Sequence, residues 1–574
     1  MKVVLKSFLV ILISALAKAS FEQAGSCKVF CQGPLLDAVQ RAHIFEDSKH
    51  FVDMPMVYDP DTTLAAFEQI EDKNDPAAIR EFVSQYFTEP GTELQACQQT
   101  DWTPEPKSFD RIHDPIYRQW AYAIHAKWRT LCRRMKDEVR QNPNRYSLIH
   151  SAHPFIAPGG RFREFYYWDT YWIIKGLLAS QMYNSTKAVI MNLADMIERF
   201  GFIPNGGRVY YLHRTQPPLF AGCVFEYFKA TNDLEFVKMM LPLMERERVY
   251  WQRERSVDLQ TFDGDSVQFY QYRAKADGPR PESYKEDLDT AAHVTSDNGK
   301  QQVWSDIASA CESGWDFSSR WFSQDESNPF RNTLRSVRTS KIVPVDLNAF
   351  ACWNEAIMAD LYAAVGNHSQ ADAHRADYET MRYNMKRLFW NGEKGTWFDI
   401  DLESGKQRED YYVSNPTPLF ARCAHDSKHV HEQVLNYLKS SGATGFIGGL
   451  PTSFVQSGEQ WDSPNGWAPT NHMVIEALRE SKNPRVQEAA FRMADKWIQT
   501  NYFVFVRSGG KMFEKYNVET FKSQAGGGGE YEVQEGFGWS NGVILDLLLQ
   551  YGDRLRAPPV PPSAFETIIN AIEA

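Results

Sequence analysis

The sequence has few cysteines and none of the short cysteine or histidine motifs that hold metal ions. Its 8 cysteines are spread over 574 residues, which excludes a small disulfide scaffold. No CxxC or HExxH stretch occurs, so we expect neither a metal site nor any cofactor. Cys27 and Cys31 lie close enough in sequence to pair, whereas Cys132, Cys223 and Cys352 lie in helical patterns and are expected to be buried thiols.

The chain also lacks a block of basic residues. Lys and Arg number 62 and Asp and Glu 73, which gives a formal net charge of −11. An acidic protein without a basic patch is a poor ligand for nucleic acid and is not drawn to anionic membranes. Beyond the N-terminal segment no run is long and apolar enough for a transmembrane helix, and the C-terminus lacks the hydrophobic tail of a lipid-anchor signal. We therefore expect no nucleic-acid partner and no membrane anchor.

The N-terminal segment has the pattern of a secretory signal. Lys2 and Lys6 precede an apolar run at residues 8–16, and residues 17–19 offer a small-residue cleavage point. We predict a signal peptide at residues 1–19, followed by a single domain at residues 20–574. The sequons that begin at Asn184 and Asn367 are typical of a secreted, extracellular glycoprotein.

Most of the remaining chain shows the three-to-four-residue apolar period of amphipathic helices. The clearest helix begins at Pro115, behind an N-cap at Asp114, and is predicted to continue to about Val139. Single helices are expected at residues 76–87 and 186–200, and helix pairs at 217–230 and 233–253, 345–365 and 371–390, 429–439 and 467–479, and 485–501 and 540–551. Strand signals are confined to residues 52–56, 396–400 and 502–506. Consecutive helix pairs predict an all-α ring or solenoid of helical hairpins, although no fixed repeat period of the solenoid type occurs.

One stretch departs from the helical pattern and reads PGGRFREFYYWDTYW, at residues 158–172. It mixes charged groups with aromatic rings, which suits neither a plain core nor a plain surface. A sugar site uses such a mixture, because rings pack on the C–H face of a sugar while charged groups bond its hydroxyls. The alternative is a buried aromatic helix start with Asp169 as its N-cap. Trp-Asp recurs at residues 315–316 and 461–462, too far apart and among too many helices for a propeller.

This stretch and a second one, QWDSPNGWAP at residues 460–469, resemble the two signature sequences of trehalases. The similarity extends to CQGPLLDAVQ at residues 31–40, RPES at 280–283, ESGWDFSSRW at 312–321 and GGGGEYEVQEGFGWSNG at 526–542. It therefore covers nearly the whole chain after the leader. The resemblance implies an (α/α)6 barrel with the active site at one end. It also implies an inverting glycoside hydrolase that splits α,α-trehalose into two glucose molecules. Some animal trehalases are membrane-anchored, so the lack of a hydrophobic C-terminal tail predicts a soluble secreted form.

Hydrolysis of a glycosidic bond needs two carboxyl groups, one on each side of the bond. The resemblance places the general acid at Asp316 and the general base at Glu514. Asp316 lies between aromatic residues, where loss of solvent raises the pKa of a carboxyl group and suits a general acid. The structural alternatives are a helix N-cap at Asp316 and a surface ion pair between Glu514 and Lys515.

The resemblance also implies a set of sugar-binding positions, and their residue types agree with that role. Arginine forks bond two neighbouring hydroxyls at once, and amides add donors and acceptors. The implied positions are Arg161, Trp168, Asp169, Asn205, Arg214, Gln216, Arg280, Glu282, Gly314 and Glu530. The glycine run at residues 526–529 is interpreted as the hinge of a loop that folds over the sugar. Trehalose is the expected partner; the alternatives are another inverting α-glucosidase on the same fold and an inactive sugar-binding relative.

Overall fold

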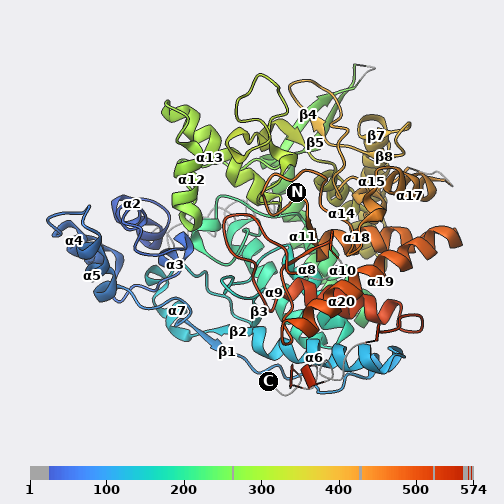
Figure 1. The fold of residues 1–574 in the computed structure, drawn as a ribbon, viewed down its shortest axis with the longest axis horizontal. Helices are drawn as coiled ribbons and strands as arrows, with labels where there is room; N and C mark the ends of the chain where they lie inside the picture. Colours follow the sequence, from blue (N-terminus) through green and yellow to red (C-terminus); the bar gives the residue numbers. More distant parts are fainter. Residues whose placement is uncertain are drawn as a thin grey trace.

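The computed structural model describes residues 25–261, 264–425, 429–520, 524–559, 566–567 and 570–571. The predicted signal peptide at residues 1–19 lies outside these described residues. The described chain forms a large helical barrel with a smaller group of N-terminal helices at one side (Figure 1). None of its helices is both long and apolar enough to cross a membrane.

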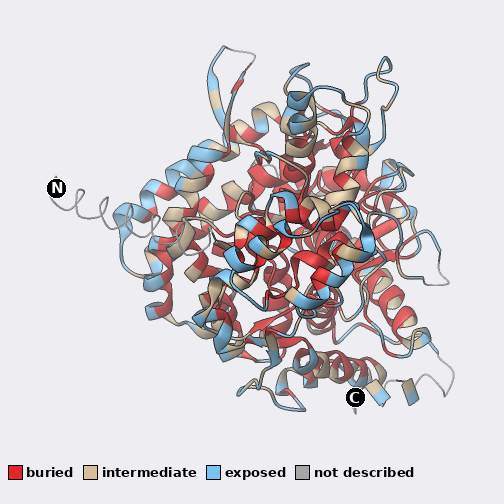
Figure 2. Cartoon of the chain, turned by 90° about the vertical axis from the view of Figure 1, so that its left-hand side faces the viewer, coloured by how far each residue is buried: buried red, intermediate tan, exposed pale blue. Residues whose placement is uncertain are grey.

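Six helices of the described chain form a closed inner ring. In chain order they are α8 (Asp169–Ala179), α10 (Phe220–Thr231), α14 (Val345–Ala364), α16 (Thr417–Phe420), α18 (Ala468–Arg479) and α20 (Gly538–Gln550). Each packs against the next, and α20 packs back against α8. The closing contact depends on glycine, because a Cβ on Gly176 of α8 would lie 2.5 Å from the Cα of Gly542 on α20. Buried residues fill the middle of the molecule (Figure 2).

Six further helices lie outside the ring and alternate with the inner helices along the sequence. They are α6 (Pro115–Leu131), α9 (Tyr183–Phe200), α11 (Leu234–Glu254), α15 (His368–Leu388), α17 (Val430–Ser440) and α19 (Pro484–Arg507). Outer helices pack on inner ones, for example α15 on α14 and α19 on α18. This arrangement is an (α/α)6 barrel, and the predicted all-α fold class is confirmed.

Local capping explains where several helices begin and end. Asp114 accepts hydrogen bonds from the backbone N–H groups of Ile116 and Tyr117 ahead of Pro115, so α6 begins where the sequence predicts. At its other end α9 stops at Gly201, which has a φ of 82° that glycine adopts without steric cost.

Three sequence predictions about local structure are wrong. The helix from Pro115 ends at Leu131 rather than near Val139, because residues 132–135 form β2 and pair with two other strands. The strand predicted at residues 502–506 lies inside α19, where Tyr502, Val504 and Phe505 are buried on one helical face. Residues 52–56 form the end of a helix and a single bridge rather than a strand.

The helix pairing also differs from the prediction for the last four helices. α18 packs mainly against α19, which follows it, and not against α17, which precedes it. α20 packs mainly against α8, nearly 370 residues earlier in the chain, because it closes the ring. Only one strand prediction holds: residues 396–400 contain β8 (Thr396–Trp397) and the start of β9 (Ile400–Asp401).

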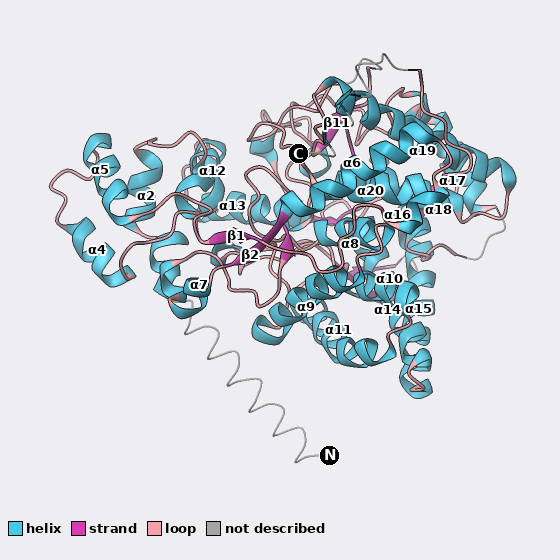
Figure 3. Cartoon of the chain, turned by 90° about the horizontal axis from the view of Figure 1, so that it is seen from below, coloured by secondary structure: helices cyan, strands magenta, loops and turns pink. Residues whose placement is uncertain are grey.

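The remaining elements surround the barrel. Short N-terminal helices extend to one side of it (Figure 3): α2 (Pro34–Arg41), α3 (Ser48–Val52), α4 (Pro60–Glu68) and α5 (Pro76–Tyr86). Further helices are α7 (Asp137–Gln141), α12 (Tyr284–Ala291) and α13 (Asp297–Glu312). Short 3-10 turns are η1 (Lys107–Arg111), η2 (Pro143–Arg145), η3 (Val209–Tyr211), η4 (Pro281–Ser283), η5 (Ser319–Trp321), η6 (Leu334–Ser336), η7 (Thr339–Lys341) and η8 (Ala443–Gly445).

The small sheets are all antiparallel. One has three strands in the order β1 (Leu94–Ala96), β2 (Cys132–Met135), β3 (Phe155–Ile156). The others are pairs: β4 (Ser256–Gln260) with β5 (Ser266–Tyr270), β6 (Ile342–Val343) with β9, β7 (Trp390–Asn391) with β8, and β10 (Asn465–Trp467) with β11 (Lys515–Asn517). The last pair matters for the site, because it joins the second signature sequence to the segment that carries Glu514.

Three disulfides cross-link the described chain. Cys27 pairs with Cys31, as their spacing allows. Cys132 and Cys352 were expected to be buried thiols, and this is wrong, because they pair with Cys97 and Cys423. These partners lie 35 and 71 residues away in sequence, so no local spacing reveals them. Cys223 is a buried free thiol as predicted, and Cys311 is another.

Candidate active site

One cavity at one end of the barrel brings together all the residues that the sequence predicts for catalysis and sugar binding. Both proposed catalytic carboxyl groups and all ten predicted sugar-binding positions line it. Its volume is about 70 Å³, room for roughly five water molecules. The lining set also includes ten residues that the sequence analysis did not predict to be catalytic or sugar-binding: Phe162, Tyr166, Tyr211, Ser283, Cys311, Trp461, Trp467, Tyr531, Phe537 and Trp539.

The cavity is built from loops that precede inner helices. Trp168 and Asp169 stand at the start of α8, Trp467 immediately precedes α18, and Trp539 lies in the first turn of α20. The two signature sequences therefore meet because the helices that follow them, α8 and α18, both pack against α20 in the ring. Gly314 must be glycine here, since its φ is 77° and a Cβ would lie 2.6 Å from the ring of Trp168.

Stacked tryptophans form one wall of the site. Trp461 lies parallel to Trp467, with ring centroids 3.9 Å apart, and Trp315 stacks on the other side at 5.2 Å. Trp539 contacts this stack edge-on, and Trp168 is tilted by 42° against Trp461. The wall supplies the aromatic surface that packs on the C–H face of a sugar.

The recurring Trp-Asp pairs have different roles. Asp169 and Asp316 line the cavity, but Asp462 does not. Its carboxylate accepts from the backbone N–H of Ser319 at 2.6 Å and from the hydroxyl of Ser318 at 3.1 Å. Asp462 thus fixes the chain immediately after Asp316, which is a structural role.

Asp316 is a buried carboxyl group in this cavity. Burial raises its pKa to about 7, and the negative charges of Glu530 and Glu514 add to the rise while Arg280 opposes it. Its backbone carbonyl accepts a hydrogen bond from the side-chain amide of Gln460, at the start of the second signature. The N-cap alternative is wrong, because Ser318 caps the following 3-10 turn.

Glu514 is also buried, with 2% of its surface exposed. One oxygen, Oε1, accepts a hydrogen bond of 2.7 Å from the hydroxyl of Tyr531. The other, Oε2, has no hydrogen-bond partner among the described residues. Burial raises the pKa of Glu514, while Lys515 and Tyr531 act in the opposite direction.

The alternative of a surface ion pair between Glu514 and Lys515 is wrong, because both side chains are buried. The ammonium group of Lys515 donates instead to Gln460 Oε1 at 2.6 Å and to the carbonyl of Gly528 at 3.2 Å. It therefore ties the second signature to the glycine-rich loop. Within that loop Gly529 has a φ of 85°, and its N–H donates to the carbonyl of Gly458.

A third carboxyl group, Asp169, shares the cavity. It is the first residue of α8 and not its N-cap, which corrects the alternative reading of this segment. Burial raises its pKa well above the ordinary value, and the negative charges of Glu514 and Asp316 contribute to the rise. Three carboxyl groups in so small a space cannot all be ionised at low cost, so at least one holds a proton at neutral pH.

Two of the predicted arginines are fully engaged with protein groups. Arg214 donates to Asn205 Oδ1 at 2.7 Å and to Glu282 Oε1 at 2.5 Å, and a third nitrogen contacts His213. Glu282 Oε2 has no partner among the described residues. These contacts leave a buried carboxylate oxygen that is able to accept from a sugar hydroxyl.

Arg280 has a similar arrangement. Its guanidinium group makes a bidentate contact with Asp287 and donates to Glu530 Oε1 at 2.7 Å and to the sulfur of Cys311 at 3.1 Å. Glu530 Oε2 also accepts from the Ser283 hydroxyl. Gln216 accepts from the backbone N–H of Trp168, which fixes the start of α8 beside the site.

The sequence carries weak signals for some of the functional residues that the sequence analysis does not predict, and none for others. Gln460 opens the second signature, and Tyr531 directly follows Glu530, so both lie inside recognised motifs. Lys515 was considered only as a surface partner. Asp47, which contacts Arg161 from the N-terminal helices, lies outside the quoted motifs and had no signal.

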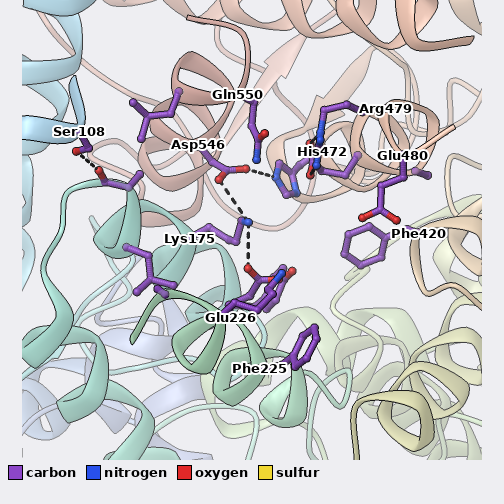
Figure 4. Close-up of a pocket in the computed structure, with 18 of the residues that line it drawn as sticks. Ser108, Lys175, Phe225, Glu226, Phe420, His472, Arg479, Glu480, Asp546 and Gln550 are labelled. Carbon is purple, nitrogen blue, oxygen red and sulfur yellow. Dashed lines mark hydrogen bonds and ion pairs between the residues drawn. The ribbon is translucent and has the colours of Figure 1, made fainter. Parts of the chain in front are cut away.

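A larger cavity of about 540 Å³ opens at the other end of the barrel (Figure 4). Its deepest charges neutralise one another: the Lys175 ammonium lies between Asp546 and Glu226, and His472 bonds Asp546 at 2.8 Å. Glu476, which also lies near His472, accepts hydrogen bonds from Nε and Nη2 of Arg479. No predicted site residue lines this cavity, so we take the smaller one as the active site.

Comparison with known proteins agrees with this geometry. A sequence model of the trehalase family matches residues 43–552. The chain is 42% identical to a trehalase of Oryctolagus cuniculus over 534 residues, covering 92% of this chain and 91% of that one. It is 40% identical to a trehalase of Apis mellifera over 559 residues, covering 96% and 88%.

Among solved structures, neutral trehalase Nth1 from Saccharomyces cerevisiae superposes with a TM-score of 0.55. Its sequence identity is 20%, and the alignment covers 73% of this chain and 76% of that one, which supports the barrel fold. The fold, the two signature sequences and the match over most of the chain lead to one conclusion: the chain belongs to the trehalase family.

Proposed function

We propose that the protein hydrolyses α,α-trehalose to two glucose molecules with inversion, Asp316 acting as general acid and Glu514 as general base. The observation that carries this proposal is the pairing of two buried carboxyl groups in one small cavity. The pKa of Asp316 is raised to about 7, so it holds a proton under mildly acidic conditions. Glu514 keeps one oxygen that has no hydrogen-bond partner in the described part of the chain, which leaves it free to accept a proton from water.

The two groups then act on opposite sides of the glycosidic bond. Asp316 gives its proton to the bridging oxygen as the bond from that oxygen to the anomeric carbon breaks. Glu514 Oε2 takes a proton from a water molecule, whose oxygen attacks the same carbon from the far face. Tyr531 donates to Oε1 and thereby orients the carboxylate. Attack with inversion requires space for that water, so the two carboxyl groups should stand roughly 6.5–9.5 Å apart.

The remaining lining residues suit two neutral sugar rings. The stacked tryptophans offer apolar faces, while Glu282 Oε2 and the free arm of Arg161 offer an acceptor and a donor for hydroxyls. A polymer-cleaving glucosidase needs a long open cleft, whereas this cavity is small. An inactive relative would have no need of both carboxyl groups. We find no feature that favours either alternative.

The proposal predicts the anomers of the first products. Incubated with trehalose, the purified protein should release one α-glucose and one β-glucose per bond cleaved, because the attacked half inverts and the leaving half does not. Proton NMR recorded before mutarotation measures the ratio, with maltose and starch as control substrates. Two α-glucose molecules per cleavage would show retention. Preference for maltose or starch would point to the other glucosidase class.

We further propose that the protein is secreted and glycosylated. The N-terminal signal pattern and the exposure of Asn184 and Asn367 support this. Expressed with its leader in a eukaryotic secreting host, the protein should reach the medium, start near residue 20 and carry a glycan at one or both asparagines. Intact-mass and peptide mass spectrometry measure all three properties. A retained Met1, or no glycan at either site, would contradict the proposal.

A further inference from the structure

Arg161 uses only part of its guanidinium group within the protein. Nε donates to Asp47 Oδ2 at 2.8 Å and Nη2 donates to Asp47 Oδ1 at 2.7 Å. Nη1 has no hydrogen-bond partner among the described residues, and the side chain lines the active-site cavity. Arg214 and Arg280, in contrast, use all three of their nitrogens on protein groups. Of the three cavity arginines, Arg161 therefore retains the most free capacity for a sugar hydroxyl.

Neighbouring groups hold the guanidinium group of Arg161 in position. The guanidinium carbon lies 4.6 Å from the centre of the Tyr531 ring, and the Tyr531 hydroxyl donates to Glu514. The backbone N–H of Arg161 donates to Gln534 Oε1 at 2.7 Å. Main chain, ring face and Asp47 thus fix Arg161 from three directions, beside the group that acts as base.

Asp47 is itself held in place. It is the N-cap of α3, and its Oδ1 accepts from the backbone N–H of Lys49 at 2.9 Å. Its carboxylate cannot rotate freely without giving up that cap. A bidentate pair between a capped carboxylate and a largely buried arginine is more strongly oriented than an ordinary surface ion pair, whose partners are both mobile.

The segment around Asp47 also contacts a second part of the site. The Lys285 ammonium donates to the carbonyls of Phe45 and Glu46, each at 2.8 Å, and the Ser48 hydroxyl donates to Glu286 at 2.8 Å. Residues 280–283, which carry Arg280 and Glu282, immediately precede this contact. The N-terminal segment therefore connects two sugar-binding segments that are more than 100 residues apart in the chain.

We propose that Asp47 is a positioning residue for the hydrolytic reaction: it holds Arg161 so that Nη1 faces the sugar next to Glu514. This inference rests on the proposed function, because it assigns a role within the same site. Asp47 lines no part of the cavity and acts through Arg161 alone. The N-terminal helices thus contribute to catalysis from outside the barrel.

The test replaces Asp47 with Asn and, separately, with Ser. Both are good N-caps, so α3 is preserved while the ion pair with Arg161 is lost. Each should lower kcat/KM for trehalose between about tenfold and about 100-fold, as misplacement of a substrate-positioning group does. Asp59→Asn is the matched control, because Asp59 also precedes an N-terminal helix and pairs with an arginine, Arg145, away from the cavity. It should leave kcat/KM and the melting temperature near those of the wild type.

A double-mutant cycle separates positioning from general stability. Arg161→Ala and the Asp47→Asn, Arg161→Ala double variant should have the same kcat/KM, because Asp47 has nothing left to position. Additive losses in the double variant, or wild-type kcat/KM in both Asp47 variants, would overturn the inference. Absence of glucose release by the wild type in the same assay would instead refute the proposed function, so the two failures are distinguishable.

Discussion

Asp316→Asn should lower kcat for trehalose by about 10²- to 10⁴-fold while the protein remains folded, because an amide cannot give the bridging oxygen a proton. Asparagine has nearly the shape of aspartic acid, and the site already holds this side chain without net charge below its raised pKa. Initial rates of glucose release measure kcat, and circular dichroism checks the fold. Asp306→Asn is the control, since Asp306 is likewise buried with a raised pKa but does not line the cavity.

The pH dependence of the wild type and of Asp316→Asn tests the same role of Asp316 in a second way. Asp316 must be protonated to act, so wild-type activity should fall as the pH rises through about 7. Glu514 must be ionised, so activity should also fall as the pH drops through its pKa, which burial raises above the ordinary value. The residual activity of Asp316→Asn should lack the alkaline limb. An unchanged alkaline limb in that variant would remove Asp316 from the role of acid.

Arg320→Met should destabilise the protein by about 3–5 kcal/mol, because it leaves two buried carboxylates without a counter-ion. The Arg320 side chain is fully buried and makes bidentate contacts with Asp346 and Asp399. It also lies between the rings of Trp315 and Trp321, at 4.7 and 4.5 Å. Urea unfolding followed by circular dichroism measures the loss.

Arg492→Met is the control for this prediction. Arg492 also pairs with a carboxylate, Glu488, but both side chains are exposed to solvent. The unfolding midpoint of this variant should stay close to that of the wild type. Equal midpoints for the two variants would mean that the buried cluster around Arg320 contributes no more than a surface pair.

The sequence predicts a helix boundary best where the residues at that boundary determine it by themselves. Asp114 with Pro115, and Gly201, determine helix ends by local hydrogen bonding and backbone geometry, and these boundaries are correct. Residues 502–506 are β-branched and aromatic, which favours a strand locally, but burial of one face within α19 overrides that preference.

The candidate site was predictable because its residues lie in contiguous motifs, and the structure brings those motifs to one cavity. Contacts between distant segments were not predictable in the same way. Asp47 and Arg161 are 114 residues apart, and Cys352 and Cys423 are 71 apart, so neither pairing has a local signal. Which helices become neighbours is decided when α20 closes the ring on α8, a contact with no counterpart in sequence spacing.

The small volume of the active-site cavity has a consequence for the timing of a turnover. Room for roughly five water molecules is less than two sugar rings occupy, so lining side chains shift when trehalose binds and again when glucose leaves. Bond cleavage and these side-chain shifts are then successive steps of one turnover. However fast the glycosidic bond is broken, the turnover number cannot exceed the rate of the shift that lets glucose leave. Because the Lys515 ammonium ties the carbonyl of Gly528 to Gln460, a substitution in the glycine-rich segment at residues 526–529 can slow these shifts without touching either carboxyl group.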